Sequence, residues 1–144
     1  MWHVYVRKDT ALVPDVARTK AGFFLDIEPV RVAELEDLQS LALAVEQAMK
    51  SGNPEVPTPS RDEYKKPFLI GVAGVRTWKA FERKSACFTI FRGEGEIEIA
   101  ETGRNDAGQW IDAPSLNRTF AGDSSAMDLA RYIATRANHR TDLT

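Results

Sequence analysis

The segment from Ser125 to Ala137 constrains the fold most, because the sequence marks both its start and its buried face. Ser125 and Asp128 have the spacing of a capping box, in which the two residues satisfy each other's backbone N–H groups. Apolar residues then recur at three- and four-residue intervals, with Leu129 and Ile133 at the centre of the stripe. The pattern predicts an amphipathic helix over 125–137 that supplies part of the core.

A second amphipathic helix is predicted over 33–50, with Leu41 and Val45 at the centre of its apolar stripe. Gly52 follows it and can adopt the left-handed conformation that ends a helix. Acidic residues crowd the expected first turn, where they suit the positive end of the helix dipole: Glu34, Glu36 and Asp37.

Alternating residues in the first third of the chain predict strands. In 2–7, apolar residues fall on one face and His3, Tyr5 and Arg7 on the other. Bulky residues predict a second strand over 21–32, with a wide loop over 8–20. Pro29 is expected to end the pairing of that strand, because proline has no amide hydrogen to donate.

Further strands are predicted over 87–91 and 96–100, joined by a tight turn at 92–95, with a third over 109–112. A short helix is expected over 77–84, with Thr77 as its N-cap. Residues 67–73 are apolar, and periodicity leaves open whether they form a strand or one helical turn.

These elements predict a single α+β domain over residues 1–144, in which an antiparallel sheet packs against the two main helices. Residues 51–65 are rich in proline and polar residues, and they are interpreted as an internal connector. No apolar run reaches the ~18 residues of a membrane-spanning helix. The first residues alternate, unlike a signal peptide, so we expect a cytoplasmic protein that does not bind membranes.

The sequence offers little for catalysis or for binding a cofactor. Cys87 is the only cysteine, and with only His3 and His139 beside it a zinc cage of thiolates and imidazoles cannot be assembled. Cys87 is interpreted as a small buried residue. His3 is interpreted as a structural residue without the orienting partner that a catalytic histidine needs. We therefore expect no enzymatic activity, no metal and no cofactor.

Charge is distributed unevenly along the chain. Residues 61–93 carry a net charge of +5 and residues 94–123 a net charge of −5, within a total of −2. The basic stretch over 61–92 includes the aromatic residues Trp78 and Phe81, a composition typical of a nucleic-acid-binding surface. The two rings share one side of a short helix, which favours core packing over base stacking.

Six acidic residues form the candidate partner-binding surface: Glu94, Glu96, Glu98, Glu101, Asp106 and Asp112. In a strand whose Ile97 and Ile99 face the core, Glu96 and Glu98 lie side by side on the exposed face. One interpretation is a solvated face that protects an edge strand from aggregation. The other is a docking surface for a basic protein, where the charge accelerates association and sets orientation.

Four motifs in the middle and at the end of the chain resemble a known family. They are Lys66-Pro67, the run from Ala73 through Gly74-Val75-Arg76-Thr77-Trp78-Lys79-Ala80 to Phe81, Gly108-Gln109-Trp110-Ile111-Asp112, and Gly122-Asp123-Ser124-Ser125 before the last helix. Together they resemble the immunity proteins of bacterial contact-dependent growth inhibition, over about 66–137.

The resemblance implies a small cytoplasmic protein that binds and neutralises the C-terminal toxin domain of a large surface-delivered effector, often a nuclease such as a tRNase. It supplies no catalytic residues. A nuclease cleft must be positive to hold phosphates, which fits an acidic inhibitor surface. The alternative is a nucleic-acid-binding or regulatory protein that uses the basic 61–92 segment.

Overall fold

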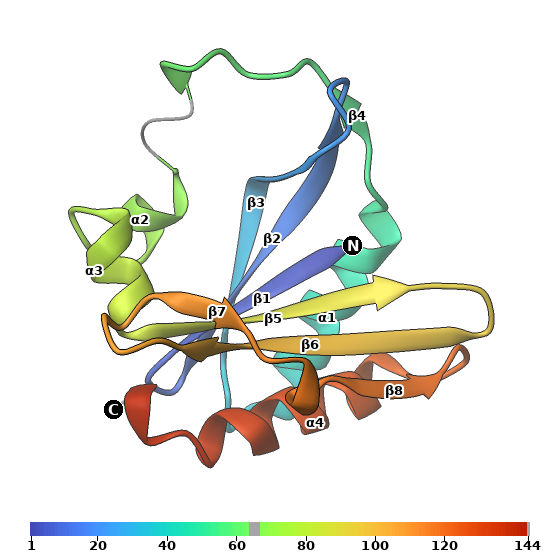
Figure 1. Cartoon of the computed structure of the whole chain (residues 1–144). Helices are drawn as coiled ribbons and strands as arrows, with labels where there is room; N and C mark the ends of the chain where they lie inside the picture. Colours follow the sequence, from blue (N-terminus) through green and yellow to red (C-terminus); the bar gives the residue numbers. More distant parts are fainter. Residues whose placement is uncertain (64–66, 144) are drawn as a thin grey trace.

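A computed structural model of the chain describes residues 1–63 and 67–143, and its first half is built on three antiparallel strands. These are β1 (Trp2–Arg7), β2 (Thr10–Thr19) and β3 (Phe24–Glu34). On its other side β1 pairs with β5 (Ser85–Arg92), which places the N-terminal strand in the middle of the sheet (Figure 1).

The second half of the chain extends the sheet beyond β5. The strand β6 (Glu96–Arg104) pairs with β5, and then with β8 (Arg118–Ala121) at one end and β7 (Trp110–Asp112) at the other. Within the described residues the order is β3-β2-β1-β5-β6-β7, with β4 (Glu55–Val56) parallel to β2. The helices are α1 (Leu38–Ser51), α2 (Leu69–Val72), α3 (Trp78–Arg83) and α4 (Ala126–Asn138), with 3-10 turns η2 (Pro114–Leu116) and η3 (Thr141–Leu143).

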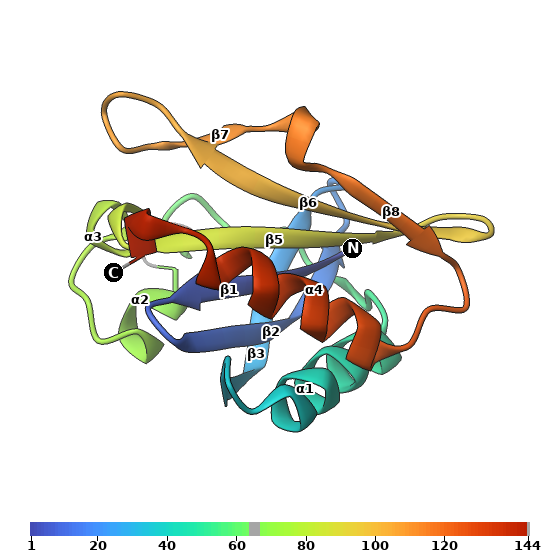
Figure 2. The same ribbon diagram turned by 90° about the horizontal axis from the view of Figure 1, so that it is seen from below.

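The two long helices, α1 and α4, lie side by side against one face of the sheet, which we call the helix face (Figure 2). The strand residues of the helix face include Val4, Val6, Phe88, Ile90, Ile97 and Ile99, all almost completely buried. Leu41 and Val45 from α1 and Leu129 and Ile133 from α4 complete this core. Burial of each such side chain contributes about 1.5–3 kcal/mol, so the helix face holds the domain together.

The opposite face of the sheet, which we call the second face, is covered only in part. Its strand residues include His3, Tyr5, Thr89, Phe91, Glu96, Glu98 and Ala100, which alternate with the residues of the helix face. At one end α2 and α3 bury Leu69 and Phe81 against Tyr5 and Cys87. Beyond this smaller cluster the second face is accessible.

The predicted α+β class is confirmed, and so is the packing of the two main helices against an antiparallel sheet. The capping box of α4 is present, with the Ser125 side chain and the Asp128 side chain each bonded to the other's backbone N–H. Thr77 caps α3 as predicted, and Gly52 ends α1 with a φ of +66°. Residues 67–73, left open from sequence, contain the single helical turn α2.

The boundaries predicted around α1 are wrong. The helix begins at Leu38 rather than at residue 33, because Glu34 still belongs to β3. Asp37 is the N-cap, where its side chain accepts a hydrogen bond from the Ser40 backbone N–H at 3.1 Å. The first turn therefore contains no acidic residue, and the predicted dipole interaction is replaced by a cap.

The wide loop predicted over 8–20 is wrong, because this segment forms β2. All seven residues from Ala11 to Ala17 are buried, although Pro14 and Asp15 interrupt the apolar pattern. The register of β2 and β3 shifts at this point, and Arg31 pairs with Asp15 at 2.6 Å. Pro29 lies within the same irregularity and does not end the pairing, which continues on both sides of it.

The connector predicted over 51–65 contains a short strand, since β4 pairs with Arg18 and Thr19 of β2. Tyr64 and Lys65, the end of that range, lie outside the described residues. The strand β8 was not predicted at all, and it changes the environment of the acidic residues on β6.

Candidate functional site

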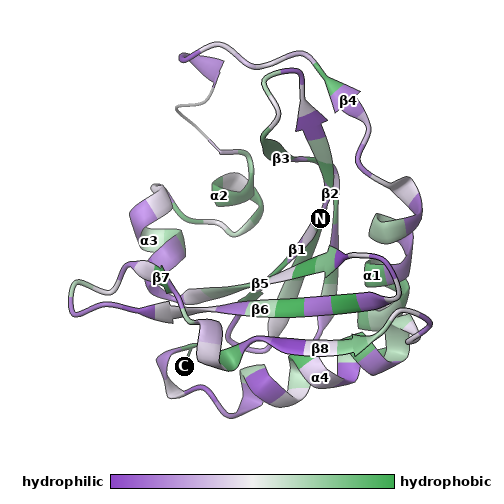
Figure 3. Ribbon diagram, turned by 45° about the vertical axis from the view of Figure 1, so that its right-hand side comes forward, coloured by the Kyte–Doolittle hydropathy of each residue, from purple (hydrophilic) through white to green (hydrophobic). Residues whose placement is uncertain are grey.

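Glu96 and Glu98 lie on the second face of the sheet, as the alternation of β6 predicts. Ile97 and Ile99 between and beyond them are buried in the core, and Figure 3 shows the resulting bands of hydrophilic and hydrophobic residues along β6. The outward neighbours on β5, β6 and β8 are uncharged: Thr89, Phe91, Ala100, Thr119 and Ala121. No ion pair joins Glu96 or Glu98 to a cation in the described part of the chain.

Glu94 extends this negative surface into the turn between β5 and β6. The Gly93 N–H donates to the Glu96 carbonyl at 2.9 Å, and Gly95 has a φ of +71° that glycine adopts without strain. The Gly122 N–H donates to the Gly95 carbonyl at 3.0 Å, so the loop after β8 packs directly on the turn. A Cβ at Gly122 would lie 2.8 Å from the Gly95 carbonyl carbon, which explains the glycine there.

Glu101 does not belong to this surface, and its assignment as a partner-binding residue is wrong. It lies on the helix face, where its side chain is 1% exposed. Its carboxylate accepts from Arg136 Nε at 2.6 Å and pairs with Arg140 at 3.4 Å. Glu101 lies five positions after Glu96, and an odd spacing on a strand places the two side chains on opposite faces.

The two aspartates of the predicted surface lie in different places in the structure, and only one of them is near Glu98. Asp112 on β7 pairs with Thr102 and lines a hollow of about 320 Å³ that also includes Glu98 and Phe91. Asp106 lies in the turn between β6 and β7, at the far end of β6 from Glu96. The surface that the structure brings together, which we call the acidic face, consists of Glu94, Glu96, Glu98 and Asp112.

Protection of an edge strand does not explain the two carboxylates of β6. The strand β8 pairs with β6 through the registers Glu96 with Ala121 and Glu98 with Thr119. Both carboxylates therefore lie on a strand with neighbours on both sides, and the edge is β8. Phe91, directly beside Glu98, leaves 40% of its surface exposed, so the acidic face borders an exposed apolar residue.

A cleft of about 510 Å³ lies elsewhere on the second face, between β3 and α2. Its floor contains His3 and Tyr5 from β1 and Asp26 from β3. His3 Nδ1 lies 2.6 Å from Asp26 Oδ1, and the Tyr5 hydroxyl donates to Asp26 Oδ2. A carboxylate can only accept, so Nδ1 carries the proton of this contact. No described residue hydrogen-bonds to His3 Nε2.

The sequence did not predict this cleft, because its key contact joins residues that are far apart in the chain. His3 was expected to lack an orienting partner, and that expectation is wrong: Asp26 comes from a strand that is two positions away in the sheet. The only signal in the sequence is that alternation places His3 and Tyr5 on one face of β1. Burial, and then the nearby Cys87 and Asp26, raise the pKa of Tyr5 well above its usual value, so this residue remains a hydrogen-bond donor.

Cys87 is buried, as predicted, and it lies in the same cluster as Tyr5 of the cleft floor. Burial raises the pKa of its thiol to about 12, which keeps it protonated at neutral pH. The thiolate is the nucleophilic form of cysteine, so this environment suits a packing role rather than a reactive one.

Trp78 and Phe81, the two aromatic residues predicted to pack in the core, lie in the smaller cluster of the second face. Phe81 is fully buried, and Trp78 stacks on it with ring centroids 5.1 Å apart. Trp110 from β7 contacts both rings edge-on. Arg76, Lys79 and Arg83 remain exposed, while Lys65 and Lys66 lie outside the described residues. The packing of Trp78 and Phe81 against each other is as predicted, and it favours a core role over base stacking for these two rings.

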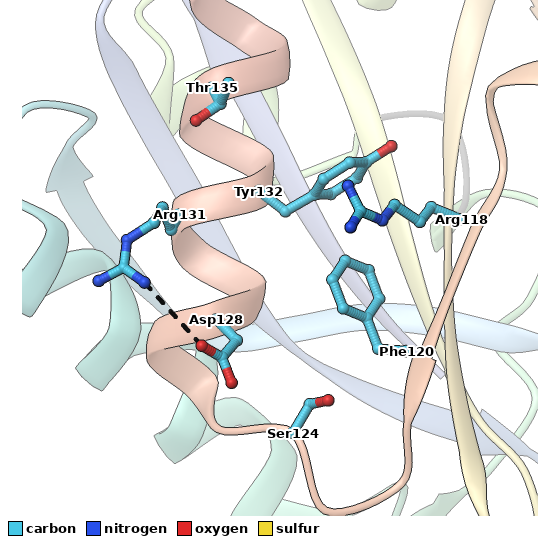
Figure 4. Close-up of a pocket in the computed structure, with 7 residues that line it drawn as sticks. All are labelled: Arg118, Phe120, Ser124, Asp128, Arg131, Tyr132 and Thr135. Carbon is cyan, nitrogen blue, oxygen red and sulfur yellow. Dashed lines mark ion pairs between the residues drawn. The ribbon is translucent and has the colours of Figure 1, made fainter.

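Another hollow, of about 420 Å³, lies on the opposite side of the molecule between β8 and α4 (Figure 4). The Arg118 guanidinium lies 5.2 Å from the ring centroids of both Phe120 and Tyr132. Asp128 and Arg131, three residues apart on α4, form an exposed pair at 4.0 Å on the helix side of the hollow. These contacts are those of an open surface groove, in which the Arg118 charge is already engaged by two rings.

Among residues 1–63 and 67–143, no three His, Cys, Asp or Glu side chains gather in a way that could hold a metal ion. In the same ranges no helix has the length and apolar character needed to cross a membrane.

Comparison with known proteins identifies the fold. No protein-family model matches the chain, and no curated protein matches it. The structure is similar to that of a protein of unknown function from Neisseria meningitidis, with a TM-score of 0.67, 13% identity, and coverage of 94% of this chain and 93% of that chain. Both chains therefore share one α+β domain fold over nearly their whole lengths.

Proposed function

We propose that the protein is an immunity protein that binds and neutralises the toxin domain of a contact-dependent growth inhibition effector. The acidic face carries this proposal. Glu96 and Glu98 on β6 and Glu94 in the preceding turn form no ion pair with another described residue, and Glu98 lies next to the exposed ring of Phe91. The resemblance of the 66–137 motifs to immunity proteins supports the same function, which would be exercised in the cytoplasm.

The chemistry of the acidic face suits a basic protein partner. Unpaired carboxylates repel one another and the phosphate backbone of a nucleic acid, so their accumulation costs the free domain stability and disfavours a direct nucleic-acid role. A nuclease domain presents the opposite charge, because its cleft must hold phosphates. Association of the two surfaces would be accelerated by long-range attraction and would exclude the substrate from the cleft.

Co-expression tests this function. The probe is the C-terminal domain of a large secreted protein encoded by the reading frame next to the gene of this chain. We expect this domain to stop growth when it is expressed alone, and to be harmless and in a complex when this chain is present. A neighbouring frame without a toxic domain, or a toxic domain that neither binds nor is neutralised by this chain, would overturn the proposal.

A further inference from the structure

The cleft between β3 and α2 combines aromatic walls with a carboxylate floor, and nothing above assigns it a ligand. Phe24 from β3, Phe68 at the start of α2 and Trp78 from α3 line the walls. Asp26 lies in the floor and Glu63 at the rim. The volume of about 510 Å³ lies within the ~300–1,000 Å³ range of ligand sites.

These groups match a flat cation. Asp26 is held in place by His3 and Tyr5, and its side chain remains 14% exposed. Each carboxylate oxygen has two acceptor positions, and one bond to each oxygen leaves room for further donors. A guanidinium group is planar, stacks on aromatic rings and donates two parallel hydrogen bonds to a carboxylate, whereas an ammonium group is a strongly hydrated point charge.

The cleft and the acidic face lie on the same side of the sheet. His3 pairs with Thr89, which pairs with Ala100, and Glu98 lies two residues further along β6. Strand spacing and rise place His3 and Glu98 about 12 Å apart. A partner that covers ~800 Å² would contact both.

We propose that the cleft receives an arginine side chain of the basic partner, which anchors the complex that the acidic face attracts. This inference rests on the function proposed above. Buried arginine and aromatic residues provide much of the binding energy in protein interfaces, while exposed rim charges mainly affect the association rate. The cleft would therefore slow the dissociation of the partner, and the acidic face would accelerate its association.

The first test needs no toxin domain. N-acetyl-arginine methylamide is titrated into the full chain and followed by the NMR shift of the Trp78 indole N–H. The matched control probe is the citrulline analogue, which has nearly the same shape and no charge. We expect millimolar binding of the arginine probe and at least fivefold weaker binding of the citrulline probe. Equal binding of the two probes, or no shift with either, would overturn the inference.

Variants locate the site. Asp26→Asn keeps an acceptor for the Tyr5 hydroxyl and removes the charge, and Phe24→Leu keeps apolar bulk and removes a ring that is 37% exposed. We expect each to weaken binding of the arginine probe at least fivefold. Asp106→Asn, a loss of the same charge at an exposed position outside both the cleft and the acidic face, should leave it unchanged. Phe24→Leu retains the test should Asp26→Asn fail to fold.

The second test distinguishes two possible ligands of the cleft, an arginine side chain of a protein and a free guanidinium compound. We expect Asp26→Asn and Phe24→Leu to increase the dissociation rate of the toxin domain at least tenfold. Unchanged toxin dissociation, with the arginine probe still bound to the parent, would contradict the protein source while the function proposed above stands. Failure of the toxin domain to bind the parent would refute that function instead.

Discussion

Glu98 and Glu101 lie three residues apart on β6 but on opposite faces, so the same change at both positions separates a buried ion pair from a surface charge. Glu101→Gln removes the negative charge that Arg136 and Arg140 contact at 2.6 and 3.4 Å. Arg140 keeps its contact with Asp142 at 2.7 Å, but Arg136 has no other ion pair among the described residues. Glu98→Gln removes a charge that has no such partner.

The burial of the two partners sets the size of the effect. Breaking one end of a fully buried pair costs about 3–5 kcal/mol, because the remaining charge is left uncompensated. The Glu101 side chain is 1% exposed, but Arg136 remains 35% exposed to water, which reduces the cost. We therefore expect Glu101→Gln to lower the free energy of unfolding by roughly 2–4 kcal/mol, within a typical total of about 5–15 kcal/mol. A surface change such as Glu98→Gln should stay within about 0.5 kcal/mol.

Urea unfolding of the parent and both variants, followed by circular dichroism, measures these differences. Unequal midpoints with equal slopes would show that stability alone has changed. Thermal unfolding should agree, with a melting temperature lowered by roughly 6–12 °C for Glu101→Gln. Similar losses in the two variants would refute the placement of Glu101 on the helix face.

Three further predictions concern the core, the stability of the fold at acidic pH, and binding of nucleic acids. Leu129→Ala should lower the free energy of unfolding by about 2–5 kcal/mol in the same urea assay, because the side chain is 1% exposed, whereas Leu43→Ala, at a position 52% exposed, should change it little. Hydrogen bonds from Arg140 hold the pKa of Asp142 well below its usual value of 3.8, so the unfolded chain takes up this proton first as the pH falls. The parent should therefore lose stability as the pH falls from about 5 towards 2, and Asp142→Asn should lose less over the same range in pH-dependent urea unfolding. The chain alone should show no tight, salt-sensitive RNA binding by fluorescence anisotropy at about 50 and 200 mM salt, and such binding, lost in Lys79→Glu, would favour the nucleic-acid-binding alternative.

Local signals in the sequence were sufficient for elements that carry their own caps and periodicity. The capping box at Ser125, the N-cap at Thr77 and the alternation of β6 depend on residues within a few positions of one another. Segment 10–19 was misread because Pro14 and Asp15 break its apolar run. Both residues fit into β2 because the register shifts between them and because Arg31 of the neighbouring strand pairs with Asp15. Neither feature can be seen in the sequence of this segment alone.

The candidate site shows the same difference between features set by one strand and features set by contacts between strands. Alternation correctly placed Glu96 and Glu98 outward, because only β6 itself was needed. Glu101 was grouped with them by sequence proximity, although the odd spacing along the strand already implied the opposite face. The pairing of His3 with Asp26 depends on the order of β1, β2 and β3 in the sheet, which no short motif records.

The affinity of the toxin domain for charge-reversed variants tests the central claim, that the acidic face docks a basic partner. The test variant carries Glu96→Lys and Glu98→Lys. The control carries Asp106→Lys and Glu36→Lys, which change the net charge equally at exposed positions away from the acidic face. We expect the test variant to associate at least tenfold more slowly than the parent at low salt, with a smaller difference at moderate salt because ions screen exposed charges. The control should remain close to the parent at both salts, and equal association of the test variant and the parent at both salts would contradict the claim.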